Sequence, residues 1–119
     1  MRVPLGVMAA CAALGSAAGA QPAPAYPQHD IRCFIVASTV VGGADNEKAK
    51  SAGMLAAIYF AGKIYGASPQ IGLQAAIETE LDKMADIDLT TVRKECGEEM
   101  RVHGNEIEGA GKALQAKGK

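Results

Sequence analysis

The sequence lacks the features that would mark a nucleic-acid-binding protein. Its 12 Lys and Arg residues are offset by 13 Asp and Glu residues, which leaves a formal net charge of −1, and the two signs are interspersed along the chain. Binding to nucleic acid calls for a basic stripe or patch. We therefore expect no nucleic-acid partner.

Motifs for catalysis or for a bound cofactor are also lacking. The serines and threonines have no nucleophile motif around them, and no glycine-rich loop precedes a helix in a phosphate-binding pattern. No two cysteines have the C-x-x-C spacing of redox and haem sites. Carboxylate pairs such as Glu78 and Glu80 are common on helix surfaces. The sequence predicts no catalytic residue, no cofactor and no enzymatic activity.

Histidine is scarce, with two residues in the chain. Glu99, His103 and Glu106 would lie on neighbouring turns of one helix and could offer an imidazole and two carboxylates to a metal ion. A metal centre in a helical bundle takes its ligands from several helices, however, and we expect His29 to lie in a flexible segment. We interpret the cluster as ordinary surface residues and predict no metal site.

The beginning of the chain has the layout of a secretory signal peptide. Arg2 is followed by an apolar run from Val3 to about Leu14 and by small residues that end at Ala20. This run is shorter than the roughly 20 apolar residues that a membrane span needs. We predict a signal peptide over residues 1–20, cleavage after Ala20, a periplasmic location and no stable membrane anchor.

Of the three cysteines, Cys11 lies inside the predicted signal peptide. Met8 stands where a lipid-attachment signal usually has leucine, so loss of Cys11 with the signal is favoured, and lipidation remains the alternative. Cys33 and Cys96 are then left in an oxidising compartment, where two cysteines of a small domain usually pair. We predict a Cys33–Cys96 disulfide that stabilises the fold by about 4 kcal/mol, because it closes a long loop.

The remaining chain has room for one domain. Residues 21–29 contain three prolines and are predicted to form an extended, flexible lead-in. Residues 30–115 are predicted to form a single all-α domain of three to four helices. Residues 116–119 are predicted to be a disordered tail.

The first two helices are expected over residues 30–41 and from just after Asp45 or Asn46 to about Tyr65. Residues 30–41 place apolar side chains on one helical face and have Asp30 as an N-cap, but their β-branched content leaves a strand as the alternative. Gly66 favours the end of the second helix.

The last two helices are expected from Pro69 to about Asp86 and from Leu89 to about Gln115. Ser68 and Pro69 predict the start of the third helix, because serine is a good N-cap and proline fits the first helical position. Glycines in the fourth helix lower its helix propensity, so its last third is expected to fray or kink.

The predicted second helix carries most of the aromatic residues. Its apolar face is expected to consist of Ala52, Leu55, Ala56, Tyr59, Phe60 and Ile64. On its other side Gly53, Ala57 and Ala61 recur at every fourth position, which would let a neighbouring backbone approach closely. Aromatic residues here can be core residues or line a groove for an apolar ligand or peptide. The candidate interaction face consists of Leu55, Tyr59, Phe60 and Tyr65.

With these helices and cysteines, the domain resembles the small periplasmic acid-stress chaperones of the Hde type, which are also exported, helical, of about this size and closed by one disulfide. The resemblance rests on the export signal, on a cysteine in the first helix (DIRCFIV) and on a second at RKECGEEM. The segment between the cysteines is longer here, and Ile31 or Arg32 stands where that family commonly has an aromatic residue. The segment AAIYFAGKIYG also resembles one that recurs in small exported proteins of Gram-negative bacteria.

The resemblance implies a non-enzymatic binding or chaperone-like protein whose carboxylates lose their charge in acid, so that apolar helix faces become available to clients. The same carboxylates are equally well explained as a solubilising surface. The main alternative is a structural or accessory interaction protein of the cell envelope, and a metal or small-ligand carrier is a third. The sequence identifies no client or partner, and both a monomer and a homodimer are compatible with it.

Overall fold

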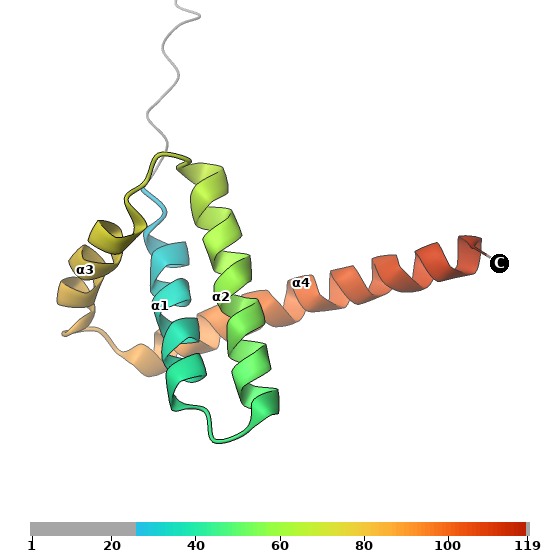
Figure 1. The fold of residues 1–119 in the computed structure, drawn as a ribbon, viewed down its shortest axis with the longest axis horizontal. Coiled ribbons are helices and arrows are strands. Elements are labelled where there is room, and N and C mark those ends of the chain that lie inside the picture. Colours follow the sequence, from blue (N-terminus) through green and yellow to red (C-terminus); the bar gives the residue numbers. More distant parts are fainter. Residues whose placement is uncertain (1–25, 119) are drawn as a thin grey trace, which may run out of the picture.

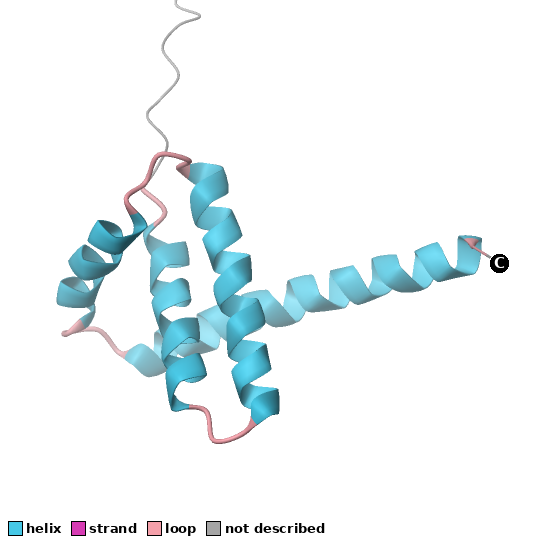
Figure 2. Cartoon of the chain, viewed as in Figure 1, coloured by secondary structure: helices cyan, strands magenta, loops and turns pink. Residues whose placement is uncertain are grey.

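A computed structural model describes residues 26–118 of the chain. These residues form four helices, α1 (Gln28–Gly43), α2 (Glu47–Ala67), α3 (Leu73–Met84) and α4 (Leu89–Lys117), as Figure 1 shows. Short loops join the helices, and this part of the chain contains no strand (Figure 2). The all-α prediction is therefore confirmed, and residues 30–41 are helical.

Two sequence predictions lie outside the described residues. They are the signal peptide over residues 1–20, which includes Cys11, and the first part of the lead-in, residues 21–25. Between residues 26 and 118, none of the helices is both long enough and apolar enough to span a membrane.

The central helix of the fold is α1. It pairs with α2 as a hairpin, α3 lies along its other side, and α4 crosses behind the hairpin and runs on past it (Figure 1). Ile31, Ile35 and Val36 of α1 are all buried. A helix that is surrounded by others is apolar on most of its sides. The strand alternative for this segment is therefore excluded by the structure, in which its apolar side chains pack as a helix in the core.

Small residues of α2 face α1. Gly53 and Ala57 are buried, and a Cβ atom added at Gly53 would lie 3.1 Å from Cγ1 of Val40. Glycine at this position lets the two helices approach closely, as the spacing of the small residues predicted.

The predicted apolar face of α2 is right only in part. Phe60 and Ile64 are buried, whereas Leu55 is 66 % exposed and Ala52 is also exposed. The reason is that α1 packs on the row of small residues, which turns that side of α2 toward the core and Leu55 away from it.

The predicted start of α3 is wrong. Ser68 instead ends α2, where its N–H donates to the carbonyl of Ile64 at 2.8 Å, and its own carbonyl accepts from the N–H of Ile71 at 3.0 Å. Pro69 is then the second residue of a turn, a position that proline also favours. As a result, α3 is shorter at both ends than the sequence predicted.

Side-chain caps begin α2 and α4 where the sequence predicted. The Asn46 side chain accepts a hydrogen bond from the N–H of Ala49 at 2.9 Å, and the Asp88 side chain accepts one from Thr90 at 2.9 Å. Such caps satisfy amide groups that have no partner within the helix.

Two predicted boundaries are wrong because helices extend further than expected. Helix α1 begins at Gln28 and not after Asp30, so His29 lies in a helix rather than in a flexible lead-in. Helix α4 continues through its glycines to Lys117, so residues 116 and 117 are helical rather than disordered, and residue 119 lies outside the described residues.

The predicted disulfide is confirmed. Cys33 of α1 and Cys96 of α4 are bonded, with their Cα atoms 5.5 Å apart, and both are buried. The apolar core that surrounds the bond includes Ile31, Ile35, Val36, Phe60, Ile64, Ala76, Met84 and Val92.

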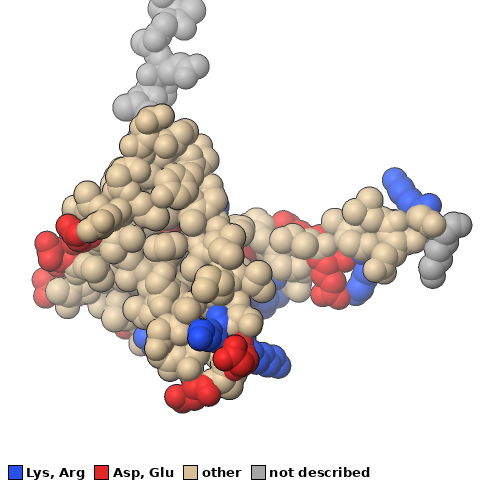
Figure 3. Space-filling view, in the orientation of Figure 1, with Lys and Arg blue, Asp and Glu red and all other residues tan. Residues whose placement is uncertain are grey.

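Charged side chains are unevenly distributed over the face of the molecule that Figure 3 shows. Most of the body in Figure 3 carries neither basic nor acidic residues, and the charges gather over α3, at the turn between α1 and α2, and along α4. The large uncharged area lies over the hairpin.

Candidate functional site

Among residues 26–118, Glu80 is the only charged residue that is buried. It lies on α3 and is 0 % exposed. Its carboxylate accepts hydrogen bonds from Nε of Arg32 at 3.0 Å and Nε2 of Gln28 at 3.3 Å, both on α1, and from Nζ of Lys83 on α3 at 3.0 Å. Glu80 therefore ties α3 to α1.

The charge of Glu80 is stabilised by its partners. Burial alone would raise the pKa of the carboxyl group, because the charged form loses water. Hydrogen bonds from Lys83, Arg32 and Gln28 outweigh burial and hold the pKa of Glu80 below its ordinary value. The carboxylate is thus ionised in the folded chain at neutral pH, and the contact between α3 and α1 depends on that ionisation.

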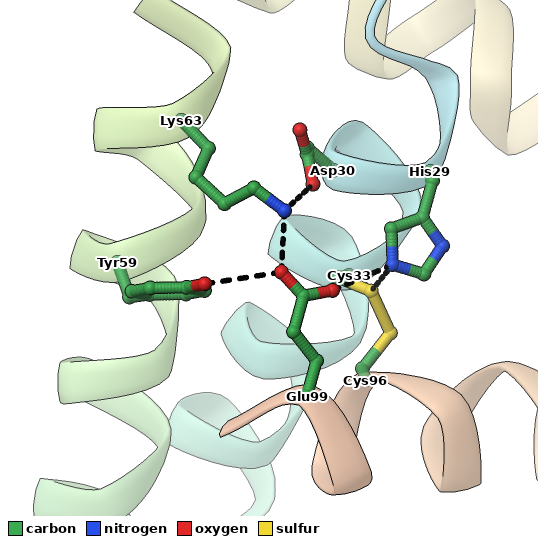
Figure 4. The surroundings of a disulfide bond; sticks show 7 residues. All are labelled: His29, Asp30, Cys33, Tyr59, Lys63, Cys96 and Glu99. Carbon is green, nitrogen blue, oxygen red and sulfur yellow. Dashed lines mark hydrogen bonds and ion pairs between the residues drawn. A yellow bond between two sulfur atoms is a disulfide. The ribbon is translucent and has the colours of Figure 1, made fainter. Parts of the chain in front are cut away.

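A second cluster surrounds Glu99 beside the disulfide (Figure 4). One carboxylate oxygen accepts a hydrogen bond from the Tyr59 hydroxyl at 3.1 Å and pairs with the Lys63 ammonium. The other oxygen lies 2.9 Å from Nε2 of His29. Lys63 also pairs with Asp30 at 2.7 Å. The cluster therefore joins α1, α2 and α4.

The same balance of burial and hydrogen bonding sets the charges of this cluster. Burial would raise the pKa of Glu99, but hydrogen bonds from Lys63, His29 and Tyr59 outweigh it and lower the pKa. Burial would lower the pKa of Lys63, but hydrogen bonds with Asp30 and Glu99 raise it. Both members of the central ion pair are therefore held in their charged forms.

The Glu99 cluster also groups the residue types that bind metals. Ligand atoms of His29, Asp30 and Glu99 all lie within 4.8 Å of one another. The Lys63 ammonium, however, already lies against both carboxylates and compensates their charge. A metal ion would have to displace that ammonium, so the geometry favours an ion-pair cluster over a metal centre.

The grouping of Glu99, His103 and Glu106 considered from the sequence does not form. Nδ1 of His103 lies 2.8 Å from Glu106, and its ring lies against that of Tyr59, with 5.9 Å between the centroids. Glu99 points instead toward α1 and α2 (Figure 4).

Sequence reasoning missed the roles of Glu80 and His29, although signals for both were present. Glu80 follows Ala76 by four residues and precedes Met84 by four, which places it on the buried side of its helix. His29 lies one turn before Cys33 in α1. The disulfide that joins Cys33 to α4 therefore also brings His29 close to that helix.

An apolar groove of about 460 Å³ opens beside the disulfide. Its walls come from α1, α2 and α4 and include Val36, Val40, Leu55, Phe60, Gly97 and Met100. Arg93 is the only charged residue that lines it. The volume is within the range of ligand sites, which is about 300–1,000 Å³. The groove has few polar groups that could orient a substrate for a reaction. Its lining is better suited to binding an apolar surface than to catalysis.

The four residues of the predicted interaction face have different positions. Leu55 and Tyr65 are exposed, and Tyr59 is partly buried in the Glu99 cluster. Phe60 is 1 % exposed and belongs to the core, so it contributes little more than the floor of the groove in the folded chain. Ile58, which the sequence did not single out, is exposed on the same helix.

Comparisons with family models, with curated proteins and with solved structures give no match to this chain. The resemblance to the Hde-type chaperones therefore stays a prediction from the sequence. The function has to be inferred from contacts within the chain.

Proposed function

We propose that this chain is an exported, non-enzymatic, chaperone-like protein that binds apolar segments of other proteins when the pH falls. The observation that carries the proposal is the buried carboxylate of Glu80, which holds α3 on α1 through charged hydrogen bonds. Acid removes the charge on which this contact depends.

Apolar surface lies beneath the contact. Ala76 and Met84 of α3 belong to the same core cluster as Ile31 and Ile35 of α1. When α3 moves away from α1, both of these apolar faces become accessible. Surfaces of this kind bind unfolded chains, which expose apolar side chains themselves.

The direction of the pH effect follows from the pKa of Glu80. Because its pKa is lower in the folded chain than in the unfolded one, the stabilisation is fully present above the ordinary glutamate value of about 4.3. It is lost as the pH falls through the lowered pKa of the folded state. Opening is therefore expected in strong acid and not at neutral pH.

The disulfide supports both the location and the mechanism. A buried disulfide is compatible with the oxidising compartments that exported proteins enter. It also keeps α4 attached to α1 in acid, whereas α3 has no covalent link to α1. The chain can then open on the α3 side without unfolding completely.

The test measures binding of a hydrophobic dye and suppression of client aggregation from pH 7 to strongly acidic pH, for the oxidised protein. We expect both to appear together at low pH with the helical signal retained. A Glu80→Met variant replaces the charge with an apolar side chain of similar length, and we expect its dye binding to change much less with pH.

A matched control is Glu78→Met, because Glu78 lies on the same helix but is exposed. This variant is expected to respond to acid as the unmodified chain does. Dye binding that never appears in acid, or acid-induced opening that is the same in Glu80→Met and in the unmodified chain, would contradict the proposal.

A second candidate function is that of an envelope interaction protein that acts at neutral pH. It is favoured by the exposed apolar residues of α2, Leu55, Ile58 and Tyr65. Saturable binding of one partner at neutral pH, lost in an Ile58→Glu variant and retained in Glu80→Met, would support this function over the first.

A further inference from the structure

The second half of α4 extends beyond the other helices. Residues 104–117 run past the α1–α2 hairpin on the side away from α3 (Figure 1), and every one of them is exposed. Its two large apolar side chains, Ile107 and Leu114, are 70 and 71 % exposed. We call residues 104–117 the α4 extension.

The α4 extension has a composition that needs a packing partner. It contains Gly104, Gly109 and Gly111, and glycine is among the residues least favourable to a helix. Short isolated helices are only marginally stable even when their residues favour the helix, and most helices in proteins depend on tertiary contacts. A partner that covers the extension would supply those contacts.

One face of the extension continues the wall of the groove. Gly97 and Met100 line the groove, and the same spacing of three and four residues continues along the helix. Residues at this spacing share one face. Glycines and large apolar residues alternate along this face, in the order Gly97, Met100, Gly104, Ile107, Gly111 and Leu114.

We propose that the groove and the α4 extension are the two halves of a homodimer contact, in which the α4 helices of two copies pack antiparallel. Antiparallel order then sets each large residue of one copy opposite a glycine of the other. The three pairs are Ile107 with Gly104, Leu114 with Gly97, and Met100 with Gly111. Cβ atoms added at these three glycines meet nothing within 4 Å, so each position has room for the opposing side chain.

The dimensions of the extension fit this arrangement. At about 1.5 Å per residue, residues 104–117 are roughly 21 Å long. Two packed helices with axes about 8–10 Å apart have a similar total width. The extension of one copy therefore crosses the whole α1–α2 hairpin of the other. Because a twofold contact is reciprocal, each copy fills the groove of its partner and the assembly closes.

Charge also favours a second copy over a highly charged partner. The extension carries two carboxylates, Glu106 and Glu108, and two ammonium groups, Lys112 and Lys117, so its charges balance. The groove has Arg93 as its single charged lining residue. The apolar lining of the groove can therefore accommodate the α4 extension of a second copy, which is nearly neutral and has an apolar face.

This contact does not depend on the proposed chaperone function. No residue of α3 lines the groove, and neither Glu80 nor Glu99 does. If the protein dimerises but does not open in acid, the chaperone proposal fails and the dimer proposal stands. If it opens in acid but does not dimerise, the dimer proposal fails and the chaperone proposal stands.

The first test is the molar mass of the oxidised protein at neutral pH, measured by sedimentation equilibrium over a wide range of concentrations. We expect a dimer for the unmodified chain. For Leu114→Glu we expect a monomer that keeps the disulfide-bonded body and loses helix only in the extension, which then lacks its packing partner. Ala113→Glu is the control, because it adds the same charge next to this position but off the contact face. A monomeric unmodified chain, or a Leu114→Glu variant that remains dimeric, would overturn the proposal.

The second test examines the register with the double variant Gly97→Cys, Leu114→Cys. Within one chain these positions are 17 residues apart on one helix, roughly 25 Å, so a bond between them within a chain is excluded. Mild oxidation is expected to give a covalent dimer from the double variant and none from either single variant. Absence of the covalent dimer from the double variant would overturn the antiparallel pairing.

Discussion

The two sides of α1 are held by different kinds of contact. On one side, α4 is joined to α1 by the Cys33–Cys96 disulfide and by the Glu99 cluster. On the other side, α3 depends on Glu80 and on apolar packing. Acid weakens the ionic part of both contacts, because both carboxyl groups have lowered pKa values. We therefore expect α3 to leave α1 in acid while the disulfide keeps α4 attached. Under the proposed function, the same helix has one acid-resistant and one acid-sensitive attachment.

Loss of the disulfide is expected to have the largest effect. Replacing Cys33 and Cys96 together by serine should lower the free energy of unfolding by about 4 kcal/mol, because the closed loop restricts the unfolded chain. Urea unfolding of the variant and of the reduced protein measures this. Equal unfolding midpoints with and without the disulfide would show that α4 is held to α1 mainly by other contacts.

Glu80→Gln should lower the free energy of unfolding by about 3 kcal/mol at neutral pH. The variant leaves Arg32 beside a neutral group, and removing one partner of a buried ion pair is costly. Denaturant titration gives the value. Glu78→Gln on the exposed side of α3 serves as the control, and its effect should stay within about 0.5 kcal/mol. Equal effects of the two substitutions would mean that Glu80 does not hold α3.

Glu99→Gln should have a smaller effect, about 1 kcal/mol. Its cluster is partly exposed to solvent, and a glutamine can still accept hydrogen bonds from Tyr59 and Lys63. The same denaturant titration measures the loss. An effect larger than that of Glu80→Gln would reverse the comparison between the two sides of α1.

The smallest expected effect is a change in how the free energy of unfolding of the Glu80 and Glu99 variants depends on pH. The unfolded chain binds more protons than the folded one near pH 4, because the pKa values of Glu80 and Glu99 are lowered in the folded chain, so stability rises with pH there. Glu99→Gln and Glu80→Gln should each reduce this slope, because each removes one carboxyl group with a lowered pKa. Denaturant unfolding at a series of pH values measures the slopes, and an unchanged slope in both variants would contradict the account.

The fold class and the disulfide could be predicted because they depend on local patterns and on cysteine number. Cys33 and Cys96 were the two cysteines left after the predicted signal peptide, and Asn46 and Asp88 are good helix caps. The start of α3 was missed because Ser68 and Pro69 suit a turn as well as they suit a helix start. Local sequence gives no way to choose between the two.

The site was harder to predict because it depends on which helix faces which. Glu80 is polar, and it was expected at the surface until the position of α3 against α1 was known. Leu55 was expected in the core, but α1 packs on the small residues beside Gly53 instead. In both cases tertiary packing, and not helix propensity, decides which side of the helix is buried.

The central claim is that acid releases α3 from α1 while the disulfide keeps α4 in place. Hydrogen exchange of the oxidised protein at neutral and at strongly acidic pH, corrected for the intrinsic exchange rate, tests it most directly. The account predicts that protection in Leu73–Met84 falls sharply in acid while protection around Cys96 is retained. Equal loss in both regions, or protection of α3 that survives in acid, would contradict it.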